Sequence, residues 1–401
     1  MSRHAARAAV VAALAIAWSA AAAFLWRSRV PSTLRLPHLD AAAYFSRAQL
    51  HATESFSRFN AVLSVLAIVA ELVVLTLYAL HGARFTRESA AGPVGTGMLL
   101  GMLGFALVWL VQLPFDVVGL WWERRHGLTT LGYFSRVFGN WFALGGQFVF
   151  LSVALGIVMG LARTMGDRWW LPAAPVFVGL ALLFAFVTPY LLSTRRLEDP
   201  ALRAAAMRLE AREHVSRTPV VVEDVRDVTS LPNAEAAGIG PSRRVVLWDT
   251  LIDGRFTDRE VAVVLAHEFG HLARNHIWKD VGWYALFAFP GSYLIARGTR
   301  RRGGMAEPAA VPLSLLVLVG LGLLALPLRN AISRHQEAEA DWMALQTTRD
   351  PAAAVALFRR FAPTTLDEPD PSTLDYLVFA THPTIIQRIA MAQAWRQAAR
   401  P

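Results

Sequence analysis

Long stretches without charge constrain this chain more than any other feature. A membrane-spanning helix needs about 20 consecutive, mostly apolar residues. Seven stretches meet or approach that length, and the last two are the shortest and contain proline: 8–26, 61–80, 95–118, 141–161, 169–192, 281–296 and 311–328. Only 17% of the 401 residues are charged, against roughly 25% in an ordinary soluble domain. We therefore expect a mostly α fold, a polytopic bundle of about seven transmembrane helices.

Charge and cysteine content narrow the functional classes. The chain has no cysteine, which excludes disulfides, cysteine-ligated zinc and thiol nucleophiles. Its net charge is +9, and Lys279 is its only lysine. Because the arginines lie mainly in short loops beside apolar stretches, they fit contacts with lipid headgroups better than contacts with nucleic acid. We expect a lipid bilayer as partner and no nucleic acid.

The first apolar stretch also resembles a secretory signal, because Arg3 and Arg7 precede it and small residues lie near its end. Its apolar run is longer than the usual 7 to 15 residues of such signals. We therefore expect an uncleaved helix.

Two long polar regions lie outside the apolar stretches and suggest a four-part organisation. Residues 1–192 form an N-terminal transmembrane region of five helices, and residues 281–328 contain two more. Between and after them, 193–280 and 329–401 are expected to form the two parts of one peptidase domain. Helical spacing is expected over 199–215 and strands over 220–228 and 245–248, with a turn-rich connection over 232–238.

The motif that carries chemistry is His267-Glu268-Phe269-Gly270-His271. It stands in a stretch with helical spacing, 258–279, for which Thr257 or Asp258 is available as N-cap. Four residues advance a helix by about 400°, so His267 and His271 project from one face and can reach one metal ion. Glu268 lies beside that face, where it can contact a water activated by the metal. Chance would produce this pattern only about 0.01 times in such a chain.

A second acidic motif, Glu337-Ala338-Glu339-Ala340-Asp341, follows the last apolar stretch. Glu337 and Asp341 are four residues apart and share a helix face, so Glu337 can supply a third metal ligand. Asp341 can then accept a hydrogen bond from a ligand histidine and orient it. Glu339 lies about 200° around the helix from Glu337 and is expected to face solvent. Two imidazoles, a carboxylate and an open position are typical of catalytic Zn²⁺, one ion per chain.

Together these motifs resemble the integral-membrane type I CAAX prenyl endopeptidases. The resemblance rests on the two motifs above, His276, and the pair His382-Pro383 with Arg388. Further similar stretches are 123–127, Asn233-Ala234 with Gly238, and 248–250. The resemblance implies seven helices around a water-filled chamber, with an α+β zincin-type domain.

The resemblance also implies roles for individual residues. Glu337 is then the third zinc ligand, and His382 and Arg388 hold substrate or the developing oxyanion. The strand at Asn233 and Ala234 is the edge that pairs with extended peptide. His276, nine residues after His267, projects away from both ligand histidines on a continuous helix, so we expect it to support the site without binding the ion.

The expected function is membrane-embedded zinc metalloendopeptidase, in which Glu268 takes a proton from the attacking water without an acyl-enzyme. The substrates are peptides or proteins, with C-terminally lipidated ones suggested by the resemblance. The alternatives are a quality-control metalloprotease of HtpX type, with fewer spanning helices, and a transporter or channel with incidental histidines. The resemblance and a modest arginine excess favour a bacterial cytoplasmic membrane with the zinc domain on the cytosolic side.

Overall fold

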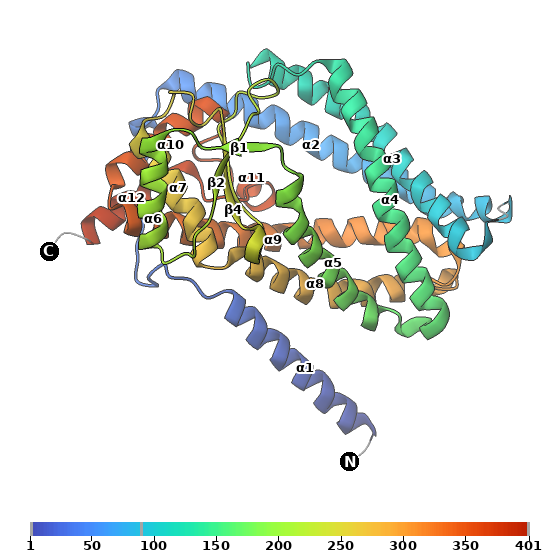
Figure 1. Cartoon of the computed structure of the whole chain (residues 1–401). Helices are drawn as coiled ribbons and strands as arrows, with labels where there is room; N and C mark the ends of the chain where they lie inside the picture. Colours follow the sequence, from blue (N-terminus) through green and yellow to red (C-terminus); the bar gives the residue numbers. More distant parts are fainter. Residues whose placement is uncertain (1–2, 89–90, 399–401) are drawn as a thin grey trace.

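The computed structural model describes residues 3–88 and 91–398, which form a helical membrane region joined to a smaller domain with a β-sheet (Figure 1). Each of the seven apolar stretches lies in an α-helix, to within one residue at either end, and most of these helices extend beyond the stretch. They are α1 (Arg3–Leu25), α2 (Arg47–His81), α3 (Gly92–Arg125), α4 (Tyr133–Met165), α5 (Trp170–Leu191), α8 (His276–Thr299) and α9 (Val311–Thr348). The polytopic helical bundle expected from the sequence is confirmed.

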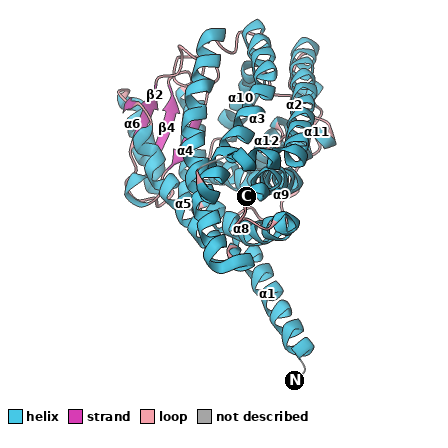
Figure 2. Cartoon of the chain, turned by 90° about the vertical axis from the view of Figure 1, so that its right-hand side faces the viewer, coloured by secondary structure: helices cyan, strands magenta, loops and turns pink. Residues whose placement is uncertain are grey.

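Five helical segments of the described chain are long and apolar enough to cross a membrane by length and composition: Arg47–Phe85, Gly92–Arg125, Tyr133–Arg168, Trp170–Leu191 and Pro308–Thr348. The other two expected spans fall short for different reasons. Among the residues whose side chains are described, α1 provides only the shorter apolar segment Val11–Leu25, and α8 is rich in aromatic residues and glycine and contains Pro290. The helix α1 extends away from the body of the protein (Figures 1 and 2) and contacts α8, where Trp18 Nε1 donates to the carbonyl of Leu286 at 3.2 Å.

The β-sheet has four short strands in the order β1-β2-β4-β3. Strands β2 (Val220–Glu223) and β4 (Arg244–Trp248) are parallel, while β1 (Thr194–Arg196) and β3 (Ala234–Ala237) flank them in antiparallel pairs. The expected strand over 220–228 is therefore too long, because the chain turns after Glu223. The expected turn over 232–238 is also wrong in part, because Ala234–Ala237 pairs with β4 as an edge strand. Tertiary pairing outweighs the weak strand preference of alanine and glutamate.

The remaining α-helices complete the smaller domain. They are α6 (Pro200–Arg212), α7 (Asp258–Ala273), α10 (Pro351–Thr365), α11 (Thr373–Val378) and α12 (Ile385–Ala398). Among them, α7 is the one that packs on the sheet. Buried side chains from β2, β4, α7, α9, α10 and α12 form one hydrophobic core. A second core joins the membrane helices α2, α3, α4, α5, α8 and α9. The two polar regions of the sequence thus meet in one core, although two membrane helices separate them in the chain.

Helix α9 connects the two cores, because it runs without interruption from the apolar stretch into the acidic motif. The expected boundaries at 280/281 and 328/329 fall inside α8 and α9, so these helices join the regions without a flexible linker. The four-part division itself stays a prediction. A rigid connection of this kind holds the acidic motif at a fixed height relative to the membrane helices.

Candidate metal centre and its surroundings

Helix α7 positions the two histidines of the first motif. Thr257 caps it: the Thr257 side chain accepts from the Glu260 amide, and the Glu260 carboxylate accepts from the Thr257 amide at 2.7 Å. This capping box satisfies amide groups that the first turn leaves unpaired. The helix packs between the sheet and α9, and His267 and Glu268 are both buried. The capping box, the sheet and α9 therefore fix the position of the helix, and with it the orientation of its two histidine side chains.

The side chains of His267, His271 and Glu337 converge across α7 and α9, although some 65 residues separate the two motifs. Their candidate ligand atoms all lie within 4.8 Å of one another. His267 Nε2 is 3.0 Å from His271 Nε2 and 3.1 Å from Glu337 Oε2, and His271 Nε2 is 3.6 Å from Glu337 Oε1. In the described chain these three residues form the one cluster of its kind. The expected juxtaposition is thus present.

The chemistry of these three groups fits a divalent metal ion. The Nε2 atoms of His267 and His271 face each other at 3.0 Å beside the Glu337 carboxylate, so a single cation could contact all three side chains. Burial lowers the pKa of His267, but the neighbouring carboxylates of Asp341 and Glu337 outweigh burial and raise it to about 10. Glu337 Oε2 is buried and accepts no hydrogen bond of good geometry. A metal ion would take the place of the proton that the site otherwise attracts.

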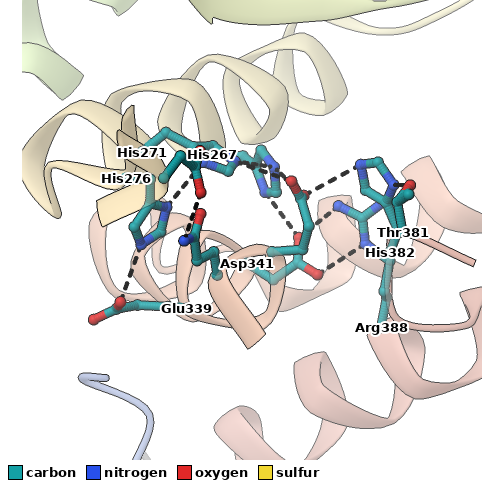
Figure 3. A network of polar contacts seen from close by, with 11 residues as sticks. His267, His271, His276, Glu339, Asp341, Thr381, His382 and Arg388 are labelled. Atoms are coloured by element: carbon teal, nitrogen blue, oxygen red, sulfur yellow. Dashed lines mark hydrogen bonds and ion pairs between the residues drawn. The ribbon is translucent and has the colours of Figure 1, made fainter. Parts of the chain in front are cut away.

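Asp341 orients His267 from behind. His267 Nδ1 donates to Asp341 Oδ1 at 2.9 Å, which leaves Nε2 free to face the ligand cluster (Figure 3). Arg388 from α12 holds Asp341 with two hydrogen bonds, Nε to Oδ2 at 2.8 Å and Nη2 to Oδ1 at 2.6 Å. The Arg388 guanidinium therefore faces Asp341, and Arg388 is not among the residues that line the cavity beside the site. A direct contact of Arg388 with an oxyanion stays a prediction.

His382 lies on the opposite side of Glu337 from α7. Its Nε2 is 3.3 Å from Glu337 Oε2, and its Nδ1 is 3.0 Å from the hydroxyl of Thr381 (Figure 3). Its side chain is half exposed, and it borders the same cavity as His267 and Glu268. The structure thus brings His382 to the ligand cluster from a loop that no periodicity in the sequence could place.

Strand β3 lies at the wall of the same cavity. Trp248 N donates to the Asn233 carbonyl at 3.0 Å, which makes these two residues a hydrogen-bonded pair of the antiparallel ladder. Because such pairs alternate, the backbone groups of Ala234 and Ala236 point away from β4, toward the open edge. Both residues line the cavity. The backbone of Asn233 is therefore engaged with β4, while Ala234 has its backbone at the free edge.

The position of Glu339 differs from the one expected from the sequence. The residue was expected to face solvent, but its side chain is 0% exposed. Its carboxylate accepts from Arg274 Nε at 2.7 Å, His276 Nε2 at 3.0 Å and Lys279 Nζ at 2.9 Å. The prediction failed because helical spacing shows only which residues share a face. It does not show that α8 covers that face.

His276 is placed as expected, although for a different reason. Helix α7 ends before it, Asn275 adopts a left-handed conformation with φ of 54°, and His276 begins α8. Asparagine tolerates this conformation better than most residues. His276 does not belong to the ligand cluster, and its Nδ1 lies 2.9 Å from His271 Nδ1.

A cavity of about 1230 Å³ extends from the metal-ligand cluster into the membrane region. Its polar end is formed by the site residues and β3. Its apolar part is lined by side chains from α3, α4, α5, α8 and α9, among them Trp283, Phe287 and Leu318. The cavity thus joins an apolar space between the helices to the polar metal-ligand cluster.

Comparisons with known proteins agree with this arrangement. The model of peptidase family M48 matches residues 195–396. The "Uncharacterized metalloprotease YhfN" of Bacillus subtilis is 24% identical over 386 residues, covering 91% of this chain and 90% of that protein. The "Probable CAAX prenyl protease 1" of Schizosaccharomyces pombe is 24% identical over 276 residues, covering 63% and 57%. The crystal structure of Ste24p from S. mikatae superposes with a TM-score of 0.73 at 20% identity, covering 96% of this chain and 98% of that chain.

Proposed function

This chain belongs to peptidase family M48, and on that premise we propose that it cleaves peptide bonds at a single zinc ion held by His267, His271 and Glu337. It is a membrane metalloendopeptidase, and the resemblance to the CAAX prenyl endopeptidases is confirmed. The proposal goes beyond the family in three respects: the identity of the metal as zinc, the roles of the individual residues and the class of substrate.

The convergence of the three ligand atoms within 4.8 Å carries the proposal. Two neutral imidazoles and one carboxylate leave a fourth position open, which is the donor set of hydrolytic zinc sites. When bound, zinc supplies the Lewis acidity that makes water nucleophilic near neutral pH and polarises the scissile carbonyl. A transporter with incidental histidines does not account for this convergence or for the family match.

Three residues of the chain have different proposed roles in the reaction: one transfers protons, one contacts the oxyanion and one holds a metal ligand in place. Glu268, on the same helix as both ligand histidines and at the cavity wall, takes the proton of the attacking water and passes it to the leaving amine. His382, whose Nε2 reaches Glu337 within 3.3 Å, stands where it can donate to the oxyanion as that charge develops. Arg388 acts through Asp341, which it holds against His267.

The substrate is proposed to be an extended peptide that pairs with the free edge of β3, where Ala234 presents its backbone. Main-chain pairing at a sheet edge binds peptides with little dependence on their sequence. The apolar part of the cavity suits a peptide with a lipidated or otherwise apolar C-terminal portion, as the name of the Schizosaccharomyces pombe relative suggests. Nucleic acid is not part of this proposal, because the arginines gather beside the membrane helices.

The membrane is proposed to be a bacterial cytoplasmic membrane with the zinc domain on the cytosolic side. The modest excess of arginines on that side supports this orientation, and the arginine-rich composition is common in GC-rich bacteria. Because the chain has no cysteine, an Arg396→Cys variant tests the orientation. A membrane-impermeant thiol reagent should not label it in intact cells, and labelling there would contradict the proposal.

The activity test uses an internally quenched peptide that carries a farnesylated cysteine near its C-terminus, together with its unlipidated counterpart. Glu268→Gln should retain zinc, measured by elemental analysis, while cleavage falls by about 10²- to 10⁴-fold, because the proton acceptor is gone. Glu198→Gln, at an exposed position, is the matched control and should cleave as the wild type does. Equal cleavage by Glu268→Gln and the wild type would refute the proposed mechanism.

A further inference from the structure

Glu339 is a buried carboxylate that the proposed catalytic steps do not use. It lies two residues after Glu337 on α9 and is fully enclosed. Burying a carboxylate is costly unless it is paired and hydrogen-bonded. Here it accepts from the side chains of Arg274, His276 and Lys279 (2.7, 3.0 and 2.9 Å). Its position directly behind the metal cluster, with four donors in all, calls for a reason beyond the packing of α8 on α9.

The fourth donor comes from the far N-terminal part of the chain. The backbone amide of Arg29 donates to Glu339 Oε1 at 2.7 Å. Lys279 Nζ donates to the carbonyl of Arg27 at 3.0 Å, and Trp26 stacks on His335 with ring centroids 4.2 Å apart. The segment 26–30 thus closes the side of α9 that faces away from the cavity. It excludes water from Glu339 and fixes the direction of its carboxylate oxygens.

A chain of contacts leads from Glu339 to one of the metal ligands. Glu339 Oε2 lies 3.0 Å from His276 Nε2, and His276 Nδ1 lies 2.9 Å from His271 Nδ1 (Figure 3). Because an ionised carboxylate only accepts, His276 must carry a proton on Nε2. Its Nδ1 can then accept the hydrogen bond that His271 Nδ1–H donates. In this arrangement His271 Nε2 keeps its lone pair, and that atom faces His267 and Glu337.

We propose that Glu339 and His276 are positioning residues that hold His271 in the tautomer and orientation whose Nε2 binds the metal ion. The inference rests on the proposed metal site and adds residues that act on it from behind. It gives the two ligand histidines parallel supports: Asp341 holds His267 directly, and Glu339 holds His271 through an intervening imidazole. A ligand histidine usually donates a hydrogen bond from the N–H of its other ring nitrogen to such a partner, and loss of the partner typically costs 10- to 100-fold in metal affinity.

Two amide substitutions at His276 separate its two contacts. In His276→Asn the side-chain oxygen can occupy the place of Nδ1 and accept from His271, but the side chain is too short to reach Glu339. In His276→Gln the amide group reaches the place of Nε2 and can donate to Glu339, but it offers His271 no acceptor. The two variants have similar polarity and both fill part of the same buried space, so each serves as the matched control for the other.

The experiment measures Co²⁺ binding to the metal-free full-length protein in detergent by visible absorption. We expect His276→Asn to bind Co²⁺ within a few-fold of the wild type, whereas His276→Gln binds about 10- to 100-fold more weakly with an altered cobalt spectrum. The thermal unfolding midpoint of the metal-free protein should fall more in His276→Asn, which loses the Glu339 contact. A purely structural role for His276 predicts that metal affinity follows stability, which is the opposite order. His51→Leu, an exposed site on α2, controls for the loss of a histidine.

The outcomes distinguish this inference from the proposed function. If His276→Gln binds Co²⁺ as tightly as His276→Asn, the positioning role is refuted while the metal site stands. If His271→Ala binds Co²⁺ as tightly as the wild type, the metal site itself is refuted. Weaker binding in His276→Gln with near-normal binding in His276→Asn supports both.

Discussion

Asp249 illustrates how a single buried charge holds the sheet beneath the site. It follows β4 directly and is 1% exposed. It accepts hydrogen bonds from the amides of Val225 and Arg226, at 2.9 and 3.2 Å, and from the Arg226 side chain. Burial by itself raises the pKa of Asp249, but these hydrogen bonds outweigh burial and hold the pKa below its usual value. The carboxylate thereby fixes the turn after β2 against the end of β4.

The Asp249→Asn variant should therefore be less stable than the wild type, by about 1 to 3 kcal/mol near neutral pH, because charged hydrogen bonds become neutral or are lost. A carboxylate whose pKa is lowered by folding stabilises the protein above its unfolded pKa of about 3.9 and loses that contribution as pH falls through the folded value. The difference between wild type and variant should thus be full at pH 6 and shrink below about pH 4. Denaturant unfolding in detergent at both pH values measures it, and a difference that grows in acid would contradict the assignment.

For individual residues, the sequence predicts the site well where all residues of a motif lie on the same helix. The i, i+4 spacing of His267 and His271, and that of Glu337 and Asp341, shows which pairs share a face, and the structure brings those faces together. The surroundings of Glu339 could not be predicted, because its partners come from residues 26–30 and from the junction of α7 and α8. Likewise, a sequence with His382 before a proline does not show that the loop passes the metal cluster.

Among the elements, β3 shows the limit of local preference. Its four residues are mostly alanine and follow a proline, so the sequence indicates a turn. The strand forms because β4 offers it a partner. Helices were easier to predict, since apolar runs of about 20 residues and capping residues are visible in the sequence itself. Helix α8 is not among the five helices of the described chain that are apolar enough to span a membrane, and its aromatic residues Trp283 and Phe287 line the cavity.

The free edge of β3 provides a test at the level of the element. In Ala236→Pro the amide at the open edge is lost, whereas the hydrogen bonds of the Glu235 and Val246 pair to β4 stay intact. Proline is tolerated at sheet edges for this reason. We expect kcat/KM for an extended peptide to fall by roughly tenfold, the equivalent of one lost hydrogen bond of about 1.4 kcal/mol, while Co²⁺ affinity is unchanged.

Ala236→Ser is the control for that variant, because it keeps the amide and changes only the side chain. It should cleave the peptide nearly as well as the wild type. Normal kcat/KM in Ala236→Pro would show that substrate does not pair with this edge, and weakened Co²⁺ binding would show that the strand acts on the site in another way.

For the molecule as a whole, the decisive feature is that membrane helices and the peptidase domain share one cavity. Composition predicted the membrane helices, and the resemblance to known endopeptidases suggested a chamber. The residues that line the chamber could not be told from those that face lipid, because both surfaces are apolar. The helix α9 shows this well: Gly322 lines the cavity and Gly320, two residues earlier, does not. A Cβ atom added to either glycine would have no other atom within 4 Å.

These two glycines make a matched pair for testing whether the chamber holds the apolar portion of a substrate. Gly322 precedes Glu337 by 15 residues on one helix, which places it roughly 22 Å from the metal cluster at about 1.5 Å per residue. Gly322→Phe should therefore fill the remote part of the cavity without touching the site. We expect kcat/KM for the farnesylated peptide to fall at least roughly tenfold, since a misplaced substrate loses its reactive geometry. The unlipidated peptide and Co²⁺ binding should be unaffected, and Gly320→Phe should behave as the wild type with both peptides. If Gly322→Phe cleaves the farnesylated peptide normally, or if both peptides suffer equally, the apolar portion of the substrate does not occupy this part of the chamber.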